Sequence, residues 1–364
     1  MKRFKLSRSE QMILALLKSS LNGEMPDSSV FIDASADDWK KCSEIAIKQG
    51  VLALAWDGVK LLPKNLQPYK NLKISWAIAV EKYENTYDFY CQVVDELFQY
   101  FYSQNMSMVQ LKGVGLSTIY PEQRHREGGD IDIYVCPNGC FVENCSRQAD
   151  EALDKLGCGV KKDYSPKHSF CRYKGIPIEN HKTFADLGLF PVSDQIETLL
   201  QGCLNPSKAV LPNGGEVLIP SPEFNTLFVA YHNAMHYGSG FSLHHLVDWA
   251  CIIRKYGLNL PAGLKDAHFI NGVYAMTALC NRFLGTDVKI EYTPRLANEM
   301  LKELFCPVSD RIIPTDNILK CYLHRARRFV DTTRISNSIL YLPLWKNPRF
   351  KSKFIRMIKR NIGK

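Results

Sequence analysis

The stretch GGDIDIYV, residues 128–135, places two acidic residues inside an otherwise apolar run. Read as a strand, it puts Asp130 and Asp132 on one face and the isoleucines on the other. At a rise of about 3.3 Å per residue, the two aspartates lie only about 6.5–7 Å apart along the strand. Their like charges repel each other, and a half-buried strand is a costly place for unpaired carboxylates. The stretch therefore raises the question of what holds this pair.

The bulk composition narrows the class of protein. At 364 residues the chain is long enough for two or three packed units. Its 46% hydrophobic and 23% charged residues are typical of a soluble globular protein. No apolar run approaches the roughly 18–20 residues that span a bilayer, and no signal peptide is expected. The twelve cysteines lack paired spacing, and Cys136, Cys140 and Cys145 do not match a zinc site, so a reduced, cytoplasmic protein is expected.

The net charge of +9 is concentrated at the C-terminal end. Residues 320–364 carry thirteen Lys and Arg against one acid, Asp331, which leaves the remaining chain at −3. Basic residues alternate with apolar ones over 346–364, a pattern that favours a basic amphipathic helix. Such a helix fits an anionic membrane surface or a nucleic acid, but it equally fits a solvated helix packed on the domain. No nucleic-acid-binding motif accompanies it.

The pattern of apolar and polar residues changes three times along the chain. Residues 1–104 have helical periodicity, with Ser7 or Ser9 as a first cap, an end at Gly23 and a break at Gly50. Residues 105–192 predict a mixed unit in the order strand, helix, strand, helix, hairpin. Residues 193–320 predict a second helical region, and residues 321–364 a basic helical tail. We therefore expect an α+β fold, a small mixed sheet flanked by N- and C-terminal helical regions.

A metal ion explains two acids on one strand face better than a salt bridge does. Mg²⁺ takes carboxylate oxygens together with substrate phosphates, and such sites usually need a third acid. The predicted strand IPIENH supplies Glu179, with His181 two residues later. His181 fits either a place beside the metal or a plain position on the hairpin face. Glu143, Glu151 and Asp163 are alternative third acids.

Five residues around the aspartates are suited to a triphosphate. Glycine lets the backbone approach a phosphate closely. Arginine binds a phosphate with two parallel hydrogen bonds, and lysine binds it as a point charge. These residues are Lys112, Gly113, Arg126, Gly128 and Gly129. Arg126 is equally able to pair with Asp130 or Glu127.

The segment LKGVGLSTIYPEQRHREGGDIDIYV, residues 111–135, resembles the signature of the nucleotidyltransferase superfamily with the DNA polymerase β-like fold. More closely, it resembles a family of uncharacterised bacterial nucleotidyltransferases marked by L-K-G, then R-x-x-G-D-I-D and an apolar strand. Later family elements are Glu179 with His181, and the helical H-x-x-x-H at His232 and His236 leading to Asp248. The resemblance covers about residues 75–255.

This resemblance implies transfer of a nucleotidyl group from an NTP to an unidentified acceptor, a small molecule or a protein hydroxyl. It implies that Asp130, Asp132 and Glu179 bind Mg²⁺ or Mn²⁺ and act in catalysis, with Glu179 also assisting deprotonation of the acceptor. Lys112, Gly113 and Arg126 would handle the triphosphate. The C-terminal helices would form the other wall of the NTP cleft.

The sequence departs from the superfamily pattern at the turn. Gly113 is followed by Val114, so a phosphate-binding serine is missing there unless Ser117 substitutes for it. This favours, as an alternative, an inactive member that binds nucleotide or a partner protein.

The histidines leave two interpretations open. His232 and His236, followed by His244 and His245, suit a metal, although HNAMH lacks the glutamate of an H-E-x-x-H motif. Packing between two helices with hydrogen bonds to Asp248 is the other interpretation.

Overall fold

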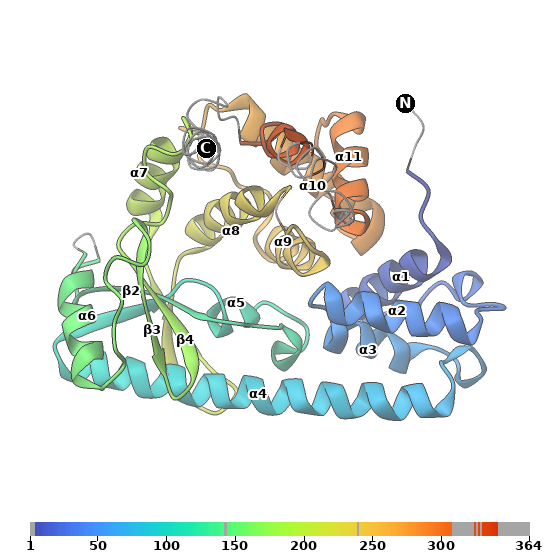
Figure 1. Ribbon diagram of the computed structural model, residues 1–364, viewed down its shortest axis with the longest axis horizontal. Helices are drawn as coiled ribbons and strands as arrows, with labels where there is room; N and C mark the ends of the chain where they lie inside the picture. The colour runs from blue at the N-terminus through green and yellow to red at the C-terminus, as the bar shows by residue number, and fades with distance from the viewer. Residues whose placement is uncertain are drawn as a thin grey trace, which may run out of the picture.

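The computed structural model describes residues 4–141, 144–238, 240–307, 324, 327 and 330–340. The fold is α+β, as expected: one six-stranded mixed sheet with helices around it (Figure 1). The strand order is β3-β4-β2-β1-β6-β5. The strands are β1 (Met106–Gln110), β2 (Ile131–Pro137), β3 (His168–Tyr173), β4 (Ile176–His181), β5 (Ser207–Val210) and β6 (Glu216–Ile219).

The sheet combines antiparallel and parallel pairing. β1 and β2 are antiparallel, whereas β2 runs parallel to β4 and β1 runs parallel to β6. The outer pairs β3–β4 and β5–β6 are antiparallel hairpins. β2 is therefore a central strand, which places the aspartate stretch in the middle of the sheet.

The alternation expected in β2 is confirmed by its packing. Ile131 and Ile133 belong to a buried cluster with Val94 and Leu97 of the helix α4 (Lys70–Ser103). Tyr134 points the other way and its ring lies 4.7 Å from that of Phe184, between centroids. Because side chains alternate along a strand, the even-numbered positions share the face opposite α4.

Figure 1 colours the helices in chain order, from blue at the N-terminus to red at the C-terminus. Three short 3-10 helices join them: η1 (Ser28–Val30), η2 (Lys64–Leu66) and η3 (Gln123–His125). The α-helices are α1 (Arg8–Asn22), α2 (Ala36–Lys48), α3 (Leu52–Leu61), α4 (Lys70–Ser103), α5 (Val114–Ser117), α6 (Ser146–Lys155), α7 (Ser193–Cys203), α8 (Pro222–His236), α9 (Leu243–Tyr256), α10 (Ala267–Leu284) and α11 (Pro294–Phe305).

The N-terminal helices begin and end where the local sequence predicts. Ser7 caps α1 in a capping box with Glu10, so Ser7 and not Ser9 is the cap. Gly23 ends α1 with a φ of 67°, a conformation that favours glycine. The helix α4 follows with 34 residues, about 50 Å at 1.5 Å per residue. It runs from the N-terminal helices along the whole sheet (Figure 1).

Two strands lie where the sequence pattern predicts only helices. β5 and β6 form a hairpin within residues 207–219, and β6 joins the sheet through Val109 and Leu218. Each strand has only four residues, and most side chains of β5 are exposed. Strands this short and exposed leave little period-two alternation, so the sheet extends beyond the predicted core of residues 105–192.

Two further expectations concern the basic tail and membrane-spanning helices. Most of the predicted basic tail, including residues 346–364, lies outside them. Within the part of the chain that the structure describes, no helix has both the length and the apolar character needed to cross a membrane.

The packing of α1 on α3 generates a first prediction. A Cβ atom at Gly58 would lie 2.4 Å from the carbonyl oxygen of Leu16, so Gly58→Ala must separate the two helices. We expect this substitution to lower the free energy of unfolding by about 1–3 kcal/mol, measured by denaturant titration. The matched control is Gly202→Ala in α7, where a Cβ atom meets nothing within 4 Å. An equal effect of both variants would contradict the prediction.

The loop that contains η3 is fixed to two helices by a buried histidine. His125 Nδ1 lies 2.5 Å from Asp57 of α3, and Nε2 lies 2.9 Å from Glu84 of α4. Burial alone would lower the pKa of His125, but the hydrogen bonds with Asp57 and Glu84 outweigh it and raise the pKa above 6.5. Charged His125 therefore stabilises the folded chain.

This stabilisation depends on pH in a defined direction. It is fully present below the ordinary histidine pKa and is lost as the pH rises through the raised pKa of the folded state. We expect His125→Gln to lower the free energy of unfolding more at pH 6 than at pH 9. Denaturant titrations of both proteins at the two pH values measure this difference. A cost that is the same at both pH values would exclude a charged His125.

Candidate functional site

Three carboxylates gather on one face of the sheet. Asp132 in β2 is paired in register with Glu179 in the parallel strand β4, so their side chains point the same way. Asp130 stands two positions before Asp132, immediately ahead of β2. The structure thus brings together the three acids that the sequence singles out. The alternatives Glu151 and Asp163 are exposed, and Glu143 lies outside the described residues.

Asp132 is the most buried of the three acids, with 1% of its surface exposed. Lys112 Nζ lies 3.0 Å from its Oδ2, and His181 Nε2 lies 2.9 Å from its Oδ1. Burial alone would raise the pKa of Asp132, but the charge of Lys112 and the contact with His181 hold it well below its usual range. Lys112 and His181 therefore compensate Asp132 in this structure, and the expectation that a metal ion binds it stays a prediction.

Glu179 and Asp130 are compensated less well. Burial raises the pKa of Glu179 to about 7, and the charges of Asp132 and Asp130 add to this effect. Burial and the charge of Asp132 also raise the pKa of Asp130. His168 Nε2 lies 3.4 Å from Glu179, but burial, together with the charge of His181, lowers the pKa of His168 to about 4. His168 is thus neutral near pH 7 and leaves the Glu179 charge in place.

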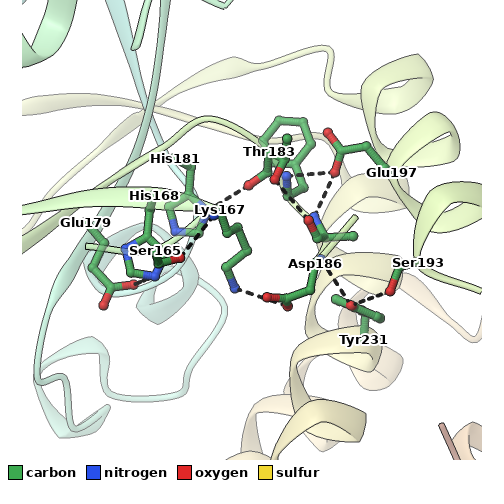
Figure 2. A network of polar contacts seen from close by, with 12 residues as sticks. Ser165, Lys167, His168, Glu179, His181, Thr183, Asp186, Ser193, Glu197 and Tyr231 are labelled. Carbon is green, nitrogen blue, oxygen red and sulfur yellow. Dashed lines mark hydrogen bonds and ion pairs between the residues drawn. The ribbon is translucent and has the colours of Figure 1, made fainter. Parts of the chain in front are cut away.

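His181 supports Asp132 and is not a free ligand. Its Nδ1 lies 3.2 Å from the carbonyl oxygen of Thr183, and its Nε2 faces the Asp132 carboxylate, so both ring nitrogens meet oxygen acceptors. Figure 2 shows this ring beside His168 and Glu179. Of the two places expected for His181, the structure selects the one beside the acids. Although His181 lies close enough to Asp132 and Glu179 to share a metal ion with them, its contacts leave that role to the carboxylates.

A polar network continues from this end of β4 to the helices α7 and α8 (Figure 2). Lys167 Nζ lies 3.9 Å from Asp186, whose backbone N–H donates to the Tyr231 hydroxyl at 3.2 Å. The Glu197 carboxylate accepts from two backbone N–H groups, those of Phe184 and Ala185, at 2.8 and 2.7 Å. The sequence analysis did not single out Lys167 and His168, because they precede or begin a strand without any recognisable motif. The network fixes β4, and with it Glu179, against the helical wall.

Arg126 is buried and its partner is Asp248 of α9. Its Nε and Nη2 each donate to the Asp248 carboxylate at 2.9 Å, and its Nη1 donates to the Gly113 carbonyl oxygen at 3.2 Å. The Tyr120 hydroxyl also donates to Asp248, and His244 Nε2 lies 3.5 Å from it. Arg126 therefore pairs with Asp248 and not with Asp130 or Glu127. The Arg126 guanidinium is thus already occupied by Asp248 and Gly113. Contact of Arg126 with a phosphate stays a prediction.

The turn after β1 needs its glycine. Gly113 has a φ of 60° and a ψ of −131°, and a Cβ atom there would lie 3.0 Å from Gln110 Nε2. By contrast, a Cβ atom at Gly128 or Gly129 would meet nothing within 4 Å. Ser117 is fully buried, where it contacts the Tyr87 hydroxyl at 2.6 Å and donates to the Val114 carbonyl at 2.7 Å. Ser117 therefore does not replace the missing phosphate-binding serine.

The helical histidines form a cluster of their own. The ring centroids of His232, His236 and His245 lie 4.6–5.6 Å apart. Burial, followed by the charge of Lys112, lowers the pKa of both His232 and His236, which places them near the site as neutral rings. Of the histidines expected to pack between the two helices beside Asp248, His244 is the one whose Nε2 lies 3.5 Å from this carboxylate, while His232 and His236 pack against His245.

These three rings lie close enough to one another to share a metal ion, but their hydrogen bonding argues against it. The Ser242 backbone N–H points at His245 Nδ1 at 3.1 Å, so Nδ1 accepts and the hydrogen sits on Nε2. A metal would have to displace this helix cap or that hydrogen. The carboxylate group of Asp130, Asp132 and Glu179 is the better candidate for a hard cation.

A cavity of about 300 Å³ lies beside the loop that leads to Asp130 and was not foreseen. It opens between α4 and the two glycine-containing loops, and Tyr83, Tyr87 and Tyr90 of α4 contribute to its lining. Their spacing of four and three residues puts the tyrosines on one helix face, a signal that the sequence contains. Aromatic residues at this spacing are usually core residues, which is why the pattern alone did not indicate a pocket.

The Arg126–Asp248 pair generates a prediction for stability. Removing one partner leaves the other charge buried, so Asp248→Ala or Arg126→Met should each cost about 3–5 kcal/mol. We expect the double variant to be more stable than the sum of the two effects implies, as measured by denaturant titration of all four proteins. The exposed pair Lys208–Glu216 is the control, and its cycle should give no measurable coupling. Additive costs at Arg126 and Asp248 would contradict the prediction.

Comparisons with known proteins identify the family of the chain. No curated protein matches the chain. A solved structure of an antigenic nucleotidyltransferase-like protein from Paracoccidioides brasiliensis is similar at 14% identity, covering 55% of this chain and 94% of that one, with a TM-score of 0.35. The model of a family described as uncharacterised nucleotidyltransferase matches residues 35–285, a wider range than the resemblance at 75–255 predicts. The match spans more than half of the chain, which therefore belongs to this family of uncharacterised nucleotidyltransferases.

Proposed function

We propose that this protein transfers a nucleotidyl group from an NTP to a hydroxyl group of an acceptor, using Mg²⁺ or Mn²⁺. Family membership supports nucleotidyl transfer as the type of reaction. The observation that carries the proposal is the placement of Asp130, Asp132 and Glu179 on one face of two adjacent parallel strands. The proposed acceptor is a small molecule or a protein hydroxyl.

The donor atoms fit a hard divalent cation. All three side chains offer carboxylate oxygens, which Mg²⁺ and Mn²⁺ prefer. The raised pKa of Asp130 and that of Glu179 indicate negative charge that the protein alone does not balance. A bound cation would neutralise charge on the triphosphate and help to orient it.

The side chains of the protein then have separate tasks. Lys112 lies on the turn before α5, 3.0 Å from Asp132, where its flexible stem allows the ammonium group to meet a phosphate oxygen instead. His181 keeps Asp132 in place when Lys112 turns away. Holding the reacting groups in position supplies most of the catalysis in reactions of this type.

Glu179 is suited to accept the proton of the acceptor. Its pKa of about 7 lies near the operating pH, which favours a general base. The acceptor oxygen forms a bond to the α-phosphorus as its proton passes to the Glu179 carboxylate. The bond from that phosphorus to the pyrophosphate breaks, and pyrophosphate leaves with the electron pair of that bond.

The test is a calorimetric titration of each NTP in the presence of Mg²⁺. We expect the wild type to bind at least one NTP, and the variant Asp130→Asn/Asp132→Asn to bind it at least about tenfold more weakly, because two metal ligands are lost. Asp163→Asn, an exposed acid outside the site, is the matched control and should bind as the wild type does.

Two results would count against the proposal. Unchanged Mg²⁺-dependent binding in the double variant would remove the acids from the nucleotide site. Binding of an NTP without any transfer of label to protein or small-molecule hydroxyls would favour the alternative, an inactive member that binds nucleotide or a partner protein. The charge balance that Lys112 and His181 give Asp132 is the feature that fits this alternative.

A further inference from the structure

The cavity beside α4 has an aromatic wall and floor. Tyr83 and Tyr90 are half-buried and line it from one face of α4. Tyr87 lies between them at the floor, where its hydroxyl contacts the buried Ser117 at 2.6 Å. Because Tyr87 is buried and its hydroxyl contacts Ser117, its ring is fixed in place, and Tyr83 and Tyr90 line the cavity from the same helix face.

This cavity adjoins the carboxylate site. Gly113 and Gly128 belong to its lining, and a Cβ atom at Gly113 would lie 3.6 Å from the carbonyl oxygen of Asp130. The Tyr90 hydroxyl donates to the Gly129 carbonyl oxygen at 3.1 Å, one residue before Asp130. A molecule bound to the acids therefore has the cavity directly next to it.

The lining carries three cations, Lys82, Arg124 and Arg126, and the acid Glu127. Lys82 is exposed, and both arginines are already paired with acids of the protein, Arg126 with Asp248 at 2.9 Å. Arg124 is taken up by Asp88, to which its Nε and Nη2 donate at 3.2 and 2.9 Å, and by Glu84 at 3.4 Å. Glu127 brings a carboxyl group that accepts the Leu52 backbone N–H at 2.8 Å. Burial raises the pKa of Glu127 to about 7. A flat, largely uncharged group with polar edges fits these surroundings better than an anion does.

We propose that this cavity receives the base of the NTP, an inference that rests on the proposed function. A volume of about 300 Å³ is at the small end of ligand pockets, so it holds a planar ring system and not a whole nucleotide. Every base offers a flat face for stacking on Tyr83 or Tyr90. The Glu127 carboxyl group lies in the same lining and contacts the Tyr83 hydroxyl, so an amino group on the edge of a base meets an acceptor beside that ring.

The experiment separates the base from the phosphates. The probes are each NTP and inorganic tripolyphosphate, titrated calorimetrically with Mg²⁺ into the full chain. Tyr83→Ala removes one ring, and Tyr83→Phe keeps the ring without its hydroxyl. Tyr102→Ala is the matched control, because Tyr102 is an exposed tyrosine on the same helix and outside the cavity.

We expect Tyr83→Ala to weaken NTP binding by about 5- to 100-fold and to leave tripolyphosphate binding unchanged, because stacking acts on the base alone. Tyr83→Phe and Tyr102→Ala should bind both probes as the wild type does. Thermal unfolding of each variant confirms that it is folded. If the Ala variant at position 83 unfolds, Tyr90→Ala takes its place with the same expected result.

Failure of this inference is distinguishable from failure of the proposed function. Unchanged NTP binding in the folded alanine variant, Tyr83→Ala or its replacement Tyr90→Ala, together with loss of binding in Asp130→Asn/Asp132→Asn, overturns the base site and keeps the function. Equal weakening of NTP and tripolyphosphate also overturns the base site, because the ring would then act on the phosphates or on the fold. If no NTP binds to the wild type, both proposals are overturned.

Discussion

The buried pair of Arg126 and Asp248 is the contact on which the site depends. It joins the loop before β2 to α9, two segments 122 residues apart in the chain. The same guanidinium holds the Gly113 carbonyl, so the turn after β1 and the helical wall are fixed by one side chain. A buried charge is stable only when its partners are complete, and here Tyr120 and His244 complete the shell around Asp248. The relative placement of sheet and helices follows from this requirement.

The three acids differ in how well the protein compensates their charge. Asp132 has a lysine and a histidine within 3.0 Å, whereas Glu179 is contacted by the neutral His168 at 3.4 Å. The two carboxyl groups therefore have pKa values shifted in opposite directions, downward for Asp132 and upward for Glu179. Such a separation of pKa values among neighbouring carboxylates is common where one group must stay ionised and another must exchange a proton.

Much of the fold could be predicted from the sequence, because local periods determine it. The alternation in residues 128–135, the hairpin around Glu179 and the ends of α1 depend only on nearby residues. The hairpin of β5 and β6 could not be predicted, since strands of four residues carry too little pattern. The partner of Arg126 was also beyond reach, because charge alone does not select Asp248 over the adjacent Glu127. Only packing across 122 residues makes that choice.

The helix α4 belongs to both hydrophobic cores. Its first half, with Trp76 and Val80, packs into the core of the N- and C-terminal helices, and its second half, with Val93 and Leu97, packs under the sheet. The 34 residues contain no glycine and no proline, so the helix has no weak point at which the halves could separate. Melting either core therefore frays a helix that the other core needs. The two regions therefore form one cooperative unit in unfolding.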